Sequence, residues 1–591
     1  MPVKENAGTN ISKEKPGLPH GVIFNAYPDS IGSRLEDCLG ILKQTPFKDA
    51  FSTFYILPTF FNSDLDRGFS IIDYNLNKEL VSSADLEVLR DLNISLKLDL
   101  VLNHLSVNSP QFKDFQKNGE SSSYRDFFID WNKFWQGKGT AGPDGCIIPE
   151  DKYLQKLFTR KPGLPVMRID FEDGNTGFFW NTFYQEIIFE QVFAEDFSTL
   201  PGITPERAAE IAASVNNAFH DKTMPDQVNL GSNEKYRELV LPIIREKRHY
   251  LGQLDLNARS TQVWEFYSET LKKLKAYGAK IIRLDAFAYL HKEAGCSNFF
   301  NRPGTWNYLE RLRKIAKRDY LLVFPEIHAE YGTGIHKEVA QKGYPIYDFF
   351  FPGLIIHALE YKTSAPLVRW IKEIISNGYK TINMLGCHDG IPVLDLKGKK
   401  LEGVEQPGLL SDKQVESLVE VIIARGGLVK NLYGPGGHKV SYYQINATFF
   451  SALGESEEKM LLARAIQLFM PGTPQVWYLD LFAGKNDYEV LEKSGPAGHK
   501  EINRTNLSLQ EVKKRLELPI VKNQLELIRF RNNYPAFEGN CEIIEEGNPF
   551  RLKISWNMDN YRTTLSANLA NNVFKIEYND NQGQSRLLQL I

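Results

Sequence analysis

Cysteine is scarce in this chain: 5 of its 591 residues are cysteine, and no two of them form a CxxC pair. Without such pairs we expect neither a zinc site nor a disulfide framework. The sequence also has no uncharged apolar run of about 18 residues, and its polar N-terminus lacks the apolar segment of a secretory signal. These absences favour a cytoplasmic protein in a reducing compartment, with a disordered tail over residues 1–17.

An excess of charge of either sign is missing as well. The chain carries 70 Lys and Arg against 73 Asp and Glu, a formal net charge of −3, and has no basic block. We therefore expect neither nucleic acid nor a membrane as a partner. Hydrophobic residues make up 42% and charged residues 24%, which is typical of a globular protein. Aromatic residues reach 12%, which suits sugar-stacking surfaces and a large core equally well.

Short apolar runs alternate with helical stretches along the chain, as in proteins with a parallel sheet. A helix is expected over residues 260–277, ended by Gly278 as a C-terminal cap. The number of runs predicts an α/β fold with a (β/α)8 barrel. The eight runs are residues 22–24, 54–57, 96–100, 281–284, 321–324, 347–350, 382–385 and 475–478.

The runs are unevenly spaced, which predicts additions to the barrel. A long gap after the third run predicts an inserted domain, and a turn-rich gap after the seventh predicts a loop excursion. Alternating segments near the end predict a C-terminal antiparallel β-domain. The expected division is a barrel over residues 18–104, 256–390 and 445–537, an inserted domain over 105–255, a loop subdomain over 391–444 and a β-domain over 538–591.

Three carboxylates come shortly after the ends of predicted strands: Asp285, Glu326 and Asp389. In a (β/α)8 barrel the chemistry lies at the C-terminal ends of the strands, so these side chains are expected to meet at one mouth. Cleavage of a glycosidic bond with retention needs two carboxyl groups about 5–5.5 Å apart, one as nucleophile and one as acid. A third carboxylate can orient the sugar and stabilise the cationic transition state.

Each residue also has a structural interpretation. Asp285 alone could cap its strand or pair with Arg283, and Glu326 could be an acidic residue in the first turn of the next helix. A single histidine, such as His104 or His388, is most often structural. The shared position of all these residues at strand ends favours one site.

Four motifs occur in order: DLVLNH (99–104), RLDA (283–286), PEIH (325–328) and CHDG (387–390). They resemble the four conserved regions of glycoside hydrolase family 13, the α-amylase clan. Further segments between about Gly21 and Gly539 resemble the sucrose phosphorylase subgroup. These include DRGF (66–69), KPGLP (161–165), YQIN (443–446) and EINR (501–504).

The resemblance implies a retaining α-glucosyl phosphorylase that forms a covalent β-glucosyl-enzyme intermediate. Asp285 would be the nucleophile, Glu326 the general acid/base with a raised pKa, and Asp389 the transition-state stabiliser. Inorganic phosphate would be a co-substrate, with no cofactor and no metal.

The resemblance also implies the residues that bind substrate. Asp66 and Arg504 would close the pocket around one glucosyl unit, while Phe69 and Tyr289 could equally be core aromatics. Sugar contacts would come from Asp66, Phe69, His104, Arg283, Tyr289, His388, Gln444 and Arg504. Phosphate or acceptor contacts would come from Arg160, Lys161, His328 and Tyr443.

The acceptor side departs from the subgroup in two places. Lys161 stands where an arginine is usual, so it offers a point charge without a bidentate fork, and with Arg160 it could be a solvated loop pair. The HKVSYY segment (438–443) lacks the aspartate expected two residues before Tyr443. The aglycone therefore stays open between sucrose and sucrose 6-phosphate, glucosylglycerol or glucosylglycerate.

Other questions also stay open at this stage. A segment of about 186–251, longer than in compact sucrose phosphorylases, could cover the entrance, mediate association or decorate the surface. The oligomeric state could be monomer or homodimer. A hydrolase or transglucosidase on the same fold and an inactive sugar-binding protein remain alternatives. An unrelated aldolase or metal hydrolase would need a Schiff-base lysine or a histidine cluster that the strand ends lack.

Overall fold

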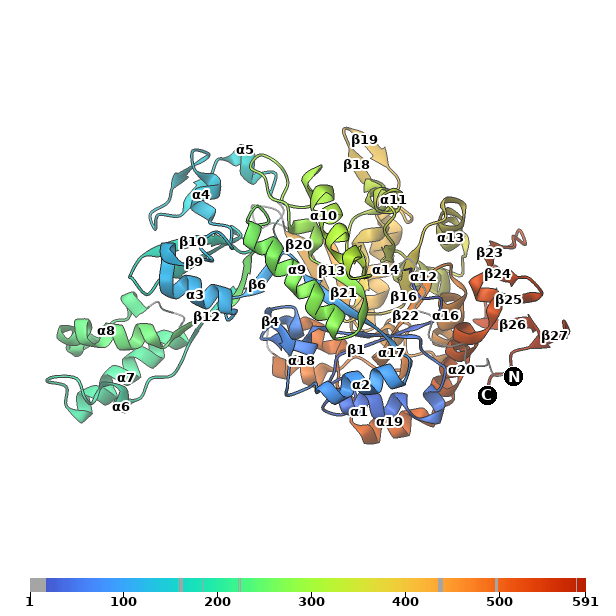
Figure 1. Cartoon of the computed structure of the whole chain (residues 1–591), viewed down its shortest axis with the longest axis horizontal. Helices are drawn as coiled ribbons and strands as arrows, with labels where there is room; N and C mark the ends of the chain where they lie inside the picture. Colours follow the sequence, from blue (N-terminus) through green and yellow to red (C-terminus); the bar gives the residue numbers. More distant parts are fainter. Residues whose placement is uncertain are drawn as a thin grey trace.

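Eight parallel strands form one sheet at the centre of the molecule (Figure 1). In this computed structural model the described residues are 17–157, 159, 163–183, 185–221, 223, 225–433, 439–494, 498–580 and 582–591. The sheet has the order β14-β13-β5-β2-β1-β22-β16-β15. The first barrel strand along the chain, β1, therefore pairs with the last, β22. The predicted barrel is confirmed. Its strands are β1 (Ile23–Ala26), β2 (Thr53–Ile56), β5 (Ser95–Val101), β13 (Ala279–Asp285), β14 (Leu322–Pro325), β15 (Ile346–Asp348), β16 (Thr381–Met384) and β22 (Thr473–Trp477).

Each predicted run overlaps one of these strands, with small differences at the ends. The sixth run continues past the observed strand because the Asp348 carboxylate accepts the backbone N–H groups of Phe350 and Phe351, which starts the next helix. Every barrel residue of β1, β2 and β16 is buried, as expected of strands covered on both faces.

Amphipathic helices cover the sheet. Helix α9 turns Val263, Trp264, Tyr267 and Leu271 into the core, and Gly278 then takes a φ of 100° that returns the chain to β13. The covering helices are α1 (Leu35–Leu42), α2 (Ser83–Asp91), α9 (Thr261–Ala276), α10 (Gly304–Arg318), α11 (Ile335–Gln341), α12 (Phe351–Tyr361), α13 (Ala365–Asn377), α16 (Glu457–Phe469), α17 (Tyr478–Leu481), α19 (Leu509–Leu516) and α20 (Pro519–Asn533).

A separate group of elements lies between β5 and α9. Trp131, Trp135 and Trp180 pack together there and form a small core of their own. Strand β12 pairs with both β6 and β11, which ties the group to the barrel. The elements are β6 (His104–Ser106), α3 (Pro110–Asn118), α4 (Trp131–Trp135), β7 (Gly139–Ala141), β8 (Ile147–Pro149), α5 (Asp151–Leu154), β9 (Val166–Asp170), β10 (Thr176–Trp180), β11 (Gln185–Phe189) and β12 (Arg248–Asp255).

Three helices, which we call the arm, lie between β11 and β12: α6 (Ala194–Phe197), α7 (Pro205–His220) and α8 (Arg237–Glu246). The arm buries its own apolar cluster, in which α7 contributes Ile211, Val215 and Phe219. In Figure 1 it projects away from the barrel at the left of the molecule. The arm falls within the segment expected to be an extra insertion; its role and the division of the chain into domains stay predictions.

After β16 the chain makes an excursion before it returns to α16. Strand β21 pairs with both β17 and β20, and β18 with β19 forms a hairpin at the top of Figure 1. The elements are β17 (Ile391–Pro392), β18 (Lys399–Leu401), β19 (Val404–Gln406), α14 (Asp412–Ala424), β20 (Leu428–Tyr433), β21 (Lys439–Asn446) and α15 (Phe449–Ala452).

The chain ends in an antiparallel sheet that packs beside α16 and α20. Trp556 is buried at this junction, and its indole Nε1 donates to the Phe469 carbonyl at 2.8 Å. The strands are β23 (Asn540–Ile543), β24 (Arg551–Met558), β25 (Tyr561–Asn568), β26 (Val573–Asn579) and β27 (Ser585–Leu587). Two segments between β2 and α2 also pair, β3 (Phe61–Ser63) and β4 (Ile71–Leu76), and α18 (Tyr488–Ser494) follows β22.

Two absences hold within the part of the chain that the structure describes. None of its helices combines the length and the apolar character that crossing a membrane requires. All five cysteines are free thiols rather than disulfides.

Candidate active site

A cavity of about 750 Å³ lies where the barrel strands, the group that contains β6 and the excursion meet. Residues from segments far apart in the sequence form its wall, because the C-terminal ends of parallel strands share one edge of the sheet. The predicted site residues that line it are Asp66, Phe69, His104, Asp285, Tyr289, Glu326, His328, His388, Asp389, Tyr443, Gln444 and Arg504.

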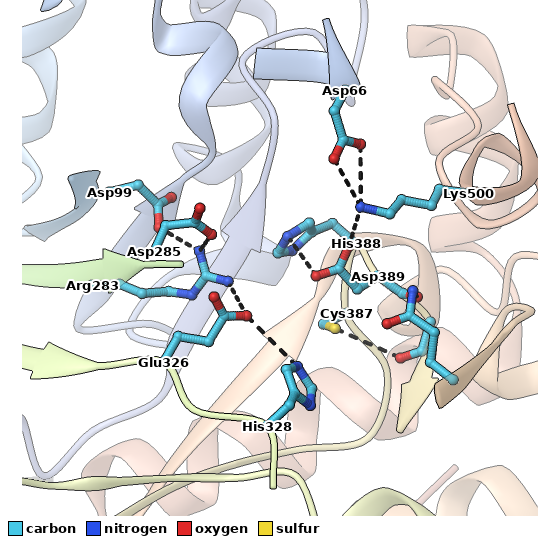
Figure 2. A network of polar contacts seen from close by, with 12 residues as sticks. Asp66, Asp99, Arg283, Asp285, Glu326, His328, Cys387, His388, Asp389 and Lys500 are labelled. Atoms are coloured by element: carbon cyan, nitrogen blue, oxygen red, sulfur yellow. Dashed lines mark hydrogen bonds and ion pairs between the residues drawn. The ribbon is translucent and has the colours of Figure 1, made fainter. Parts of the chain in front are cut away.

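Asp285 and Glu326 contact the same guanidinium group. Asp285 is the last residue of β13, and Glu326 follows the last residue of β14, its neighbour in the sheet. Arg283 Nη1 lies 3.1 Å from Asp285 Oδ1, and Arg283 Nη2 lies 2.5 Å from Glu326 Oε1 (Figure 2). The structure thus brings the two carboxylates to one point, with a fully buried cation between them.

Asp99 holds Arg283 from the barrel side. Its Oδ1 lies 2.6 Å from Arg283 Nη1, and Tyr55 donates its hydroxyl to Asp99 at 2.8 Å. Lys97 lies next to this pair, with its Nζ 3.9 Å from the centre of the Tyr55 ring. The same Nζ donates a hydrogen bond to Gln475 Oε1 at 2.5 Å. Asp99 is the first residue of the DLVLNH motif, but the motif does not show that it anchors Arg283. That role follows from the pairing of β5 with β13, which sets Asp99 opposite Arg283.

The surroundings of the two carboxylates shift their pKa values in opposite directions. Burial and the nearby Glu326 raise the pKa of Asp285 well above its usual value of 3.8. Burial also acts to raise the pKa of Glu326, but Arg283 and His328 outweigh it and hold this pKa below the usual 4.5. The expectation of a raised pKa for Glu326 is therefore wrong for this arrangement, because the 2.5 Å ion pair with Arg283 favours its charged form.

The third carboxylate, Asp389, stays ionised. Although its burial acts to raise its pKa, His388, Lys500 and Arg504 lower that pKa well below the usual value. Lys500 Nζ lies 2.7 Å from Asp389 Oδ1, and His388 Nε2 lies 3.3 Å from Oδ2 (Figure 2). The predicted sugar-binding Gln444 donates to the backbone carbonyl of Asp389 at 2.8 Å, which fixes this loop.

Lys500 is a functional candidate that the sequence did not reveal. Its Nζ lies 3.0 Å from Asp66 Oδ2 and so bridges Asp66 and Asp389. Arg504 lies beside it, 3.5 Å from Asp66 Oδ1 and 3.7 Å from Asp389 Oδ1, which matches the expected pairing of Asp66 with Arg504. A basic residue four positions before Arg504 was the only signal for Lys500.

The backbone is strained at two points of the cavity wall. Asp66 and Arg67 have φ values of 46° and 47°, and Ala286, directly after Asp285, has a φ of 52°. Non-glycine residues rarely adopt the left-handed region, and they do so most often where a functional side chain must be aimed. Here the strain orients the side chains of Asp66 and Asp285.

Aromatic and histidine rings form another part of the wall. Phe69 stacks on His388, with ring centres 4.8 Å apart, and its carbonyl oxygen accepts a hydrogen bond from His104 Nε2 at 3.2 Å. Burial lowers the pKa of His104 to about 4 and of His388 to about 3, so both rings are neutral at pH 7. Tyr289 packs edge-on against Phe183, with ring centres 5.3 Å apart, and it also lines the cavity. It is therefore both a packing residue and a part of the wall.

His328 lies next to Glu326 on another side of the cavity. Its Nε2 is 3.7 Å from Glu326 Oε1, and Tyr443 meets its ring edge-on at 5.2 Å. Lys399 and Glu330 line the same region and form an ion pair at 2.7 Å. The predicted phosphate ligands Arg160 and Lys161 lie outside the described residues, as does His438.

Across the described ranges, no cluster of three or more His, Cys, Asp or Glu side chains could hold a metal ion. The positive charges of the site come from side chains, above all Arg283, Lys500 and Arg504.

Comparisons with known proteins agree with this geometry. No family model matches the chain. It is 50% identical to "Sucrose 6(F)-phosphate phosphorylase" of Ilumatobacter coccineus, over 97% of this chain and 98% of that protein. It is 30% identical to "Sucrose phosphorylase" of Streptococcus mutans, over 88% of this chain and 89% of that protein. The crystal structure of sucrose 6F-phosphate phosphorylase from Thermoanaerobacter thermosaccharolyticum superposes with a TM-score of 0.77 at 29% identity, covering 97% of this chain and 98% of that one.

Proposed function

Because the chain belongs to the sucrose phosphorylase group of glycoside hydrolase family 13, we propose that it is a retaining α-glucosyl phosphorylase whose donor is sucrose 6F-phosphate. The reaction is sucrose 6F-phosphate plus phosphate to α-glucose 1-phosphate plus fructose 6-phosphate. The observation that carries the proposal is the pair of carboxylates on one buried guanidinium, Asp285 and Glu326 on Arg283. The donor is chosen because the relative that shares half of its residues with this chain bears that name.

In the first step Asp285 Oδ attacks C1 of the glucosyl unit and forms a C–O bond. The bond between C1 and the glycosidic oxygen breaks, and Glu326 gives its proton to that oxygen, so fructose 6-phosphate leaves with its hydroxyl restored. Attack from the face opposite the leaving group produces a β-linked glucosyl-enzyme.

This step requires the shared proton on Glu326 and a negative charge on Asp285. Arg283 contacts both groups and can compensate a charge on either. The glycosidic oxygen accepts a hydrogen bond from protonated Glu326, which holds the proton there, while Asp285 keeps Arg283 as its counter-ion. Before the donor binds, burial and Arg283 favour the proton on Asp285. Binding of the donor then favours the proton on Glu326.

In the second step an oxygen of hydrogen phosphate attacks C1 from the face that fructose 6-phosphate has left. The bond between C1 and Asp285 breaks, Glu326 takes the phosphate proton, and α-glucose 1-phosphate leaves. Two inversions give net retention. The pair of carboxylates returns to its starting state with one proton.

The remaining residues recognise the glucosyl ring. Asp389 supplies a permanent negative charge that stabilises the oxocarbenium-like transition state and accepts sugar hydroxyls. Asp66, Lys500 and Arg504 form a network of alternating charge that limits the pocket to one glucosyl unit. Phe69 offers an apolar face, and neutral His104 and His388 offer ring nitrogens.

The test is a donor screen. The enzyme is incubated with sucrose, sucrose 6F-phosphate, glucosylglycerol and glucosylglycerate, each with and without phosphate, and α-glucose 1-phosphate and glucose are assayed. We expect phosphate-dependent α-glucose 1-phosphate, with the highest kcat/KM for sucrose 6F-phosphate. Free glucose as the main product in the presence of phosphate would make the protein a hydrolase, and a preference for another donor would overturn the choice of aglycone.

A further inference from the structure

His328 is held between two carboxylates. Its Nδ1 lies 3.2 Å from Asp395 Oδ2, and its Nε2 lies 3.7 Å from Glu326 Oε1. The ring also stacks on Phe349, with centres 3.6 Å apart and planes tilted by 21°. These contacts fix both the position and the rotation of the imidazole.

Asp395 itself lies behind His328. It is 1% exposed, in the 3-10 helix Leu394–Leu396 of the excursion, and it does not line the cavity. Its other oxygen, Oδ1, accepts the backbone N–H of Ala329 at 3.1 Å. Asp395 therefore touches two consecutive residues of the loop after β14, and it can reach a bound ligand only through His328.

A carboxylate on one nitrogen of a histidine decides what the other nitrogen presents. Because Asp395 accepts from Nδ1, the proton on that nitrogen is fixed and Nε2 is directed toward Glu326. Nε2 thereby lies beside the acid/base that serves both half-reactions. A phosphate that replaces the aglycone must come within reach of this nitrogen.

We propose that Asp395 is a positioning residue that holds His328 for the phosphate acceptor, and so determines how strongly phosphate is preferred to water in the second step. The inference rests on the proposed function. It adds that the choice between phosphate and water depends on Asp395, a residue of the excursion that does not line the cavity. The alternative is that Asp395 only ties the excursion to the loop after β14 through Ala329.

The experiment uses α-glucosyl fluoride as donor, because fluoride needs little protonation to leave. The glucosyl-enzyme then partitions between phosphate, giving α-glucose 1-phosphate, and water, giving glucose. For Asp395→Asn, whose amide places a donor against Nδ1, we expect the ratio of the two products at a given phosphate concentration to fall about tenfold, as when a histidine loses the partner that orients it. Fluoride release without phosphate should change by less than about twofold.

A double-mutant cycle tests whether Asp395 acts through His328. We expect His328→Ala to lower the product ratio, and Asp395→Asn in the His328→Ala background to lower it no further. Asp85→Asn is the matched control: Asp85 is also buried and also accepts a backbone N–H group, from Ser82, and it does not line the cavity. The control should lower the melting temperature and leave the product ratio unchanged.

Three results would overturn the inference. They are a product ratio unchanged in Asp395→Asn, losses that simply add in the double variant, and an equal fall of fluoride release and phosphate transfer. If the unmodified enzyme gave no phosphate-dependent product from any donor, the proposed function would fail instead, and the two failures are thus distinguishable.

Discussion

At the scale of single residues, the chemistry depends on Arg283, which forms ion pairs with three carboxylates at once. It is fully buried, Asp99 holds it from below, and Asp285 and Glu326 share its outer nitrogens. A buried cation that contacts three carboxylates lowers the cost of burying them together. It also makes the two reacting groups interdependent, since a change of charge on one alters the other.

Replacement of the nucleophile should stop turnover. We expect Asp285→Asn to lower the rate of α-glucose 1-phosphate formation by roughly 10⁴-fold or more, because no covalent intermediate can form. Circular dichroism and melting temperature establish that the variant is folded. Glu326→Gln is the comparison: it should lose the sucrose 6F-phosphate reaction but still release fluoride from α-glucosyl fluoride. A fully active Asp285→Asn variant would contradict the assigned role.

The carboxylate pair predicts a bell-shaped pH profile. The active form holds one proton: a second proton enters on Glu326 below pH 4.5, and the single proton is lost at a pH well above 3.8, the usual value for Asp285. Activity should therefore fall on both sides. With α-glucosyl fluoride the alkaline limb should weaken, because the leaving group no longer needs the acid, while the acid limb persists. An unchanged alkaline limb would show that another group controls it.

Lys500 should matter more than its position outside the sequence motifs suggests. Lys500→Met removes one of the two cations that contact both Asp66 and Asp389. Arg504 alone then compensates the two carboxylates, and the pKa of both rises. We expect kcat/KM for the donor to fall by about 100-fold, in line with the loss of one partner from a partly buried network of ion pairs. Lys500→Arg keeps the charge and should recover most of the activity. Similar activity in Met and Arg variants would exclude an electrostatic role.

At the scale of elements, the strands carry the chemistry and the insertions shape access to it. The wall of the cavity draws on the ends of β13 and β14, on the loop after β16 and on β21. The arm contributes no residue to it in the described part of the chain. Its attachment is simple, because Glu190 N donates to Lys247 O at 2.8 Å at the end of the β11–β12 hairpin.

Removal of the arm should therefore leave catalysis intact. Residues 191–246 are replaced with an Asn-Gly turn, which suits a two-residue hairpin connection. We expect kcat/KM for sucrose 6F-phosphate to stay within about threefold, because the cluster buried in the arm is separate from the main core. Mass measurement in solution shows in the same experiment whether the arm mediates association. A large loss of activity in a folded monomer would indicate that the arm covers the entrance.

The scale of elements also shows what the sequence could predict. The barrel strands were predictable because strands buried on both faces are short, continuous apolar runs. The meeting of Asp285, Glu326 and Asp389 at one cavity was predictable because they stand shortly after the ends of those runs. Lys500, Asp395 and the anchoring role of Asp99 depend instead on which loops meet in three dimensions. The proton distribution between Asp285 and Glu326 depends on a distance to Arg283 that no sequence pattern encodes.

At the scale of the whole molecule, Arg283, Lys500 and Arg504 bring positive charge to the carboxylates of the cavity. Dialysis against a chelator should therefore leave kcat/KM unchanged, since no cluster of metal ligands occurs among the described residues. The measurement compares phosphorolysis before and after dialysis, with added Mg²⁺ and Ca²⁺ as controls. Activity that disappears and returns with a cation would reveal a metal dependence.

The closeness of His328 and Glu326, 3.7 Å apart, has a kinetic consequence for the molecule as a whole. Under the proposed function, Glu326 and the neighbouring His328 serve both the departing ketose phosphate and the incoming inorganic anion, so the two compete for the same space. The enzyme must release its first product before its second substrate can enter, which gives parallel lines in double-reciprocal plots. Accumulated fructose 6-phosphate would then slow the enzyme by occupying the place of phosphate, and the cellular ratio of these two anions would set the direction of glucosyl flow.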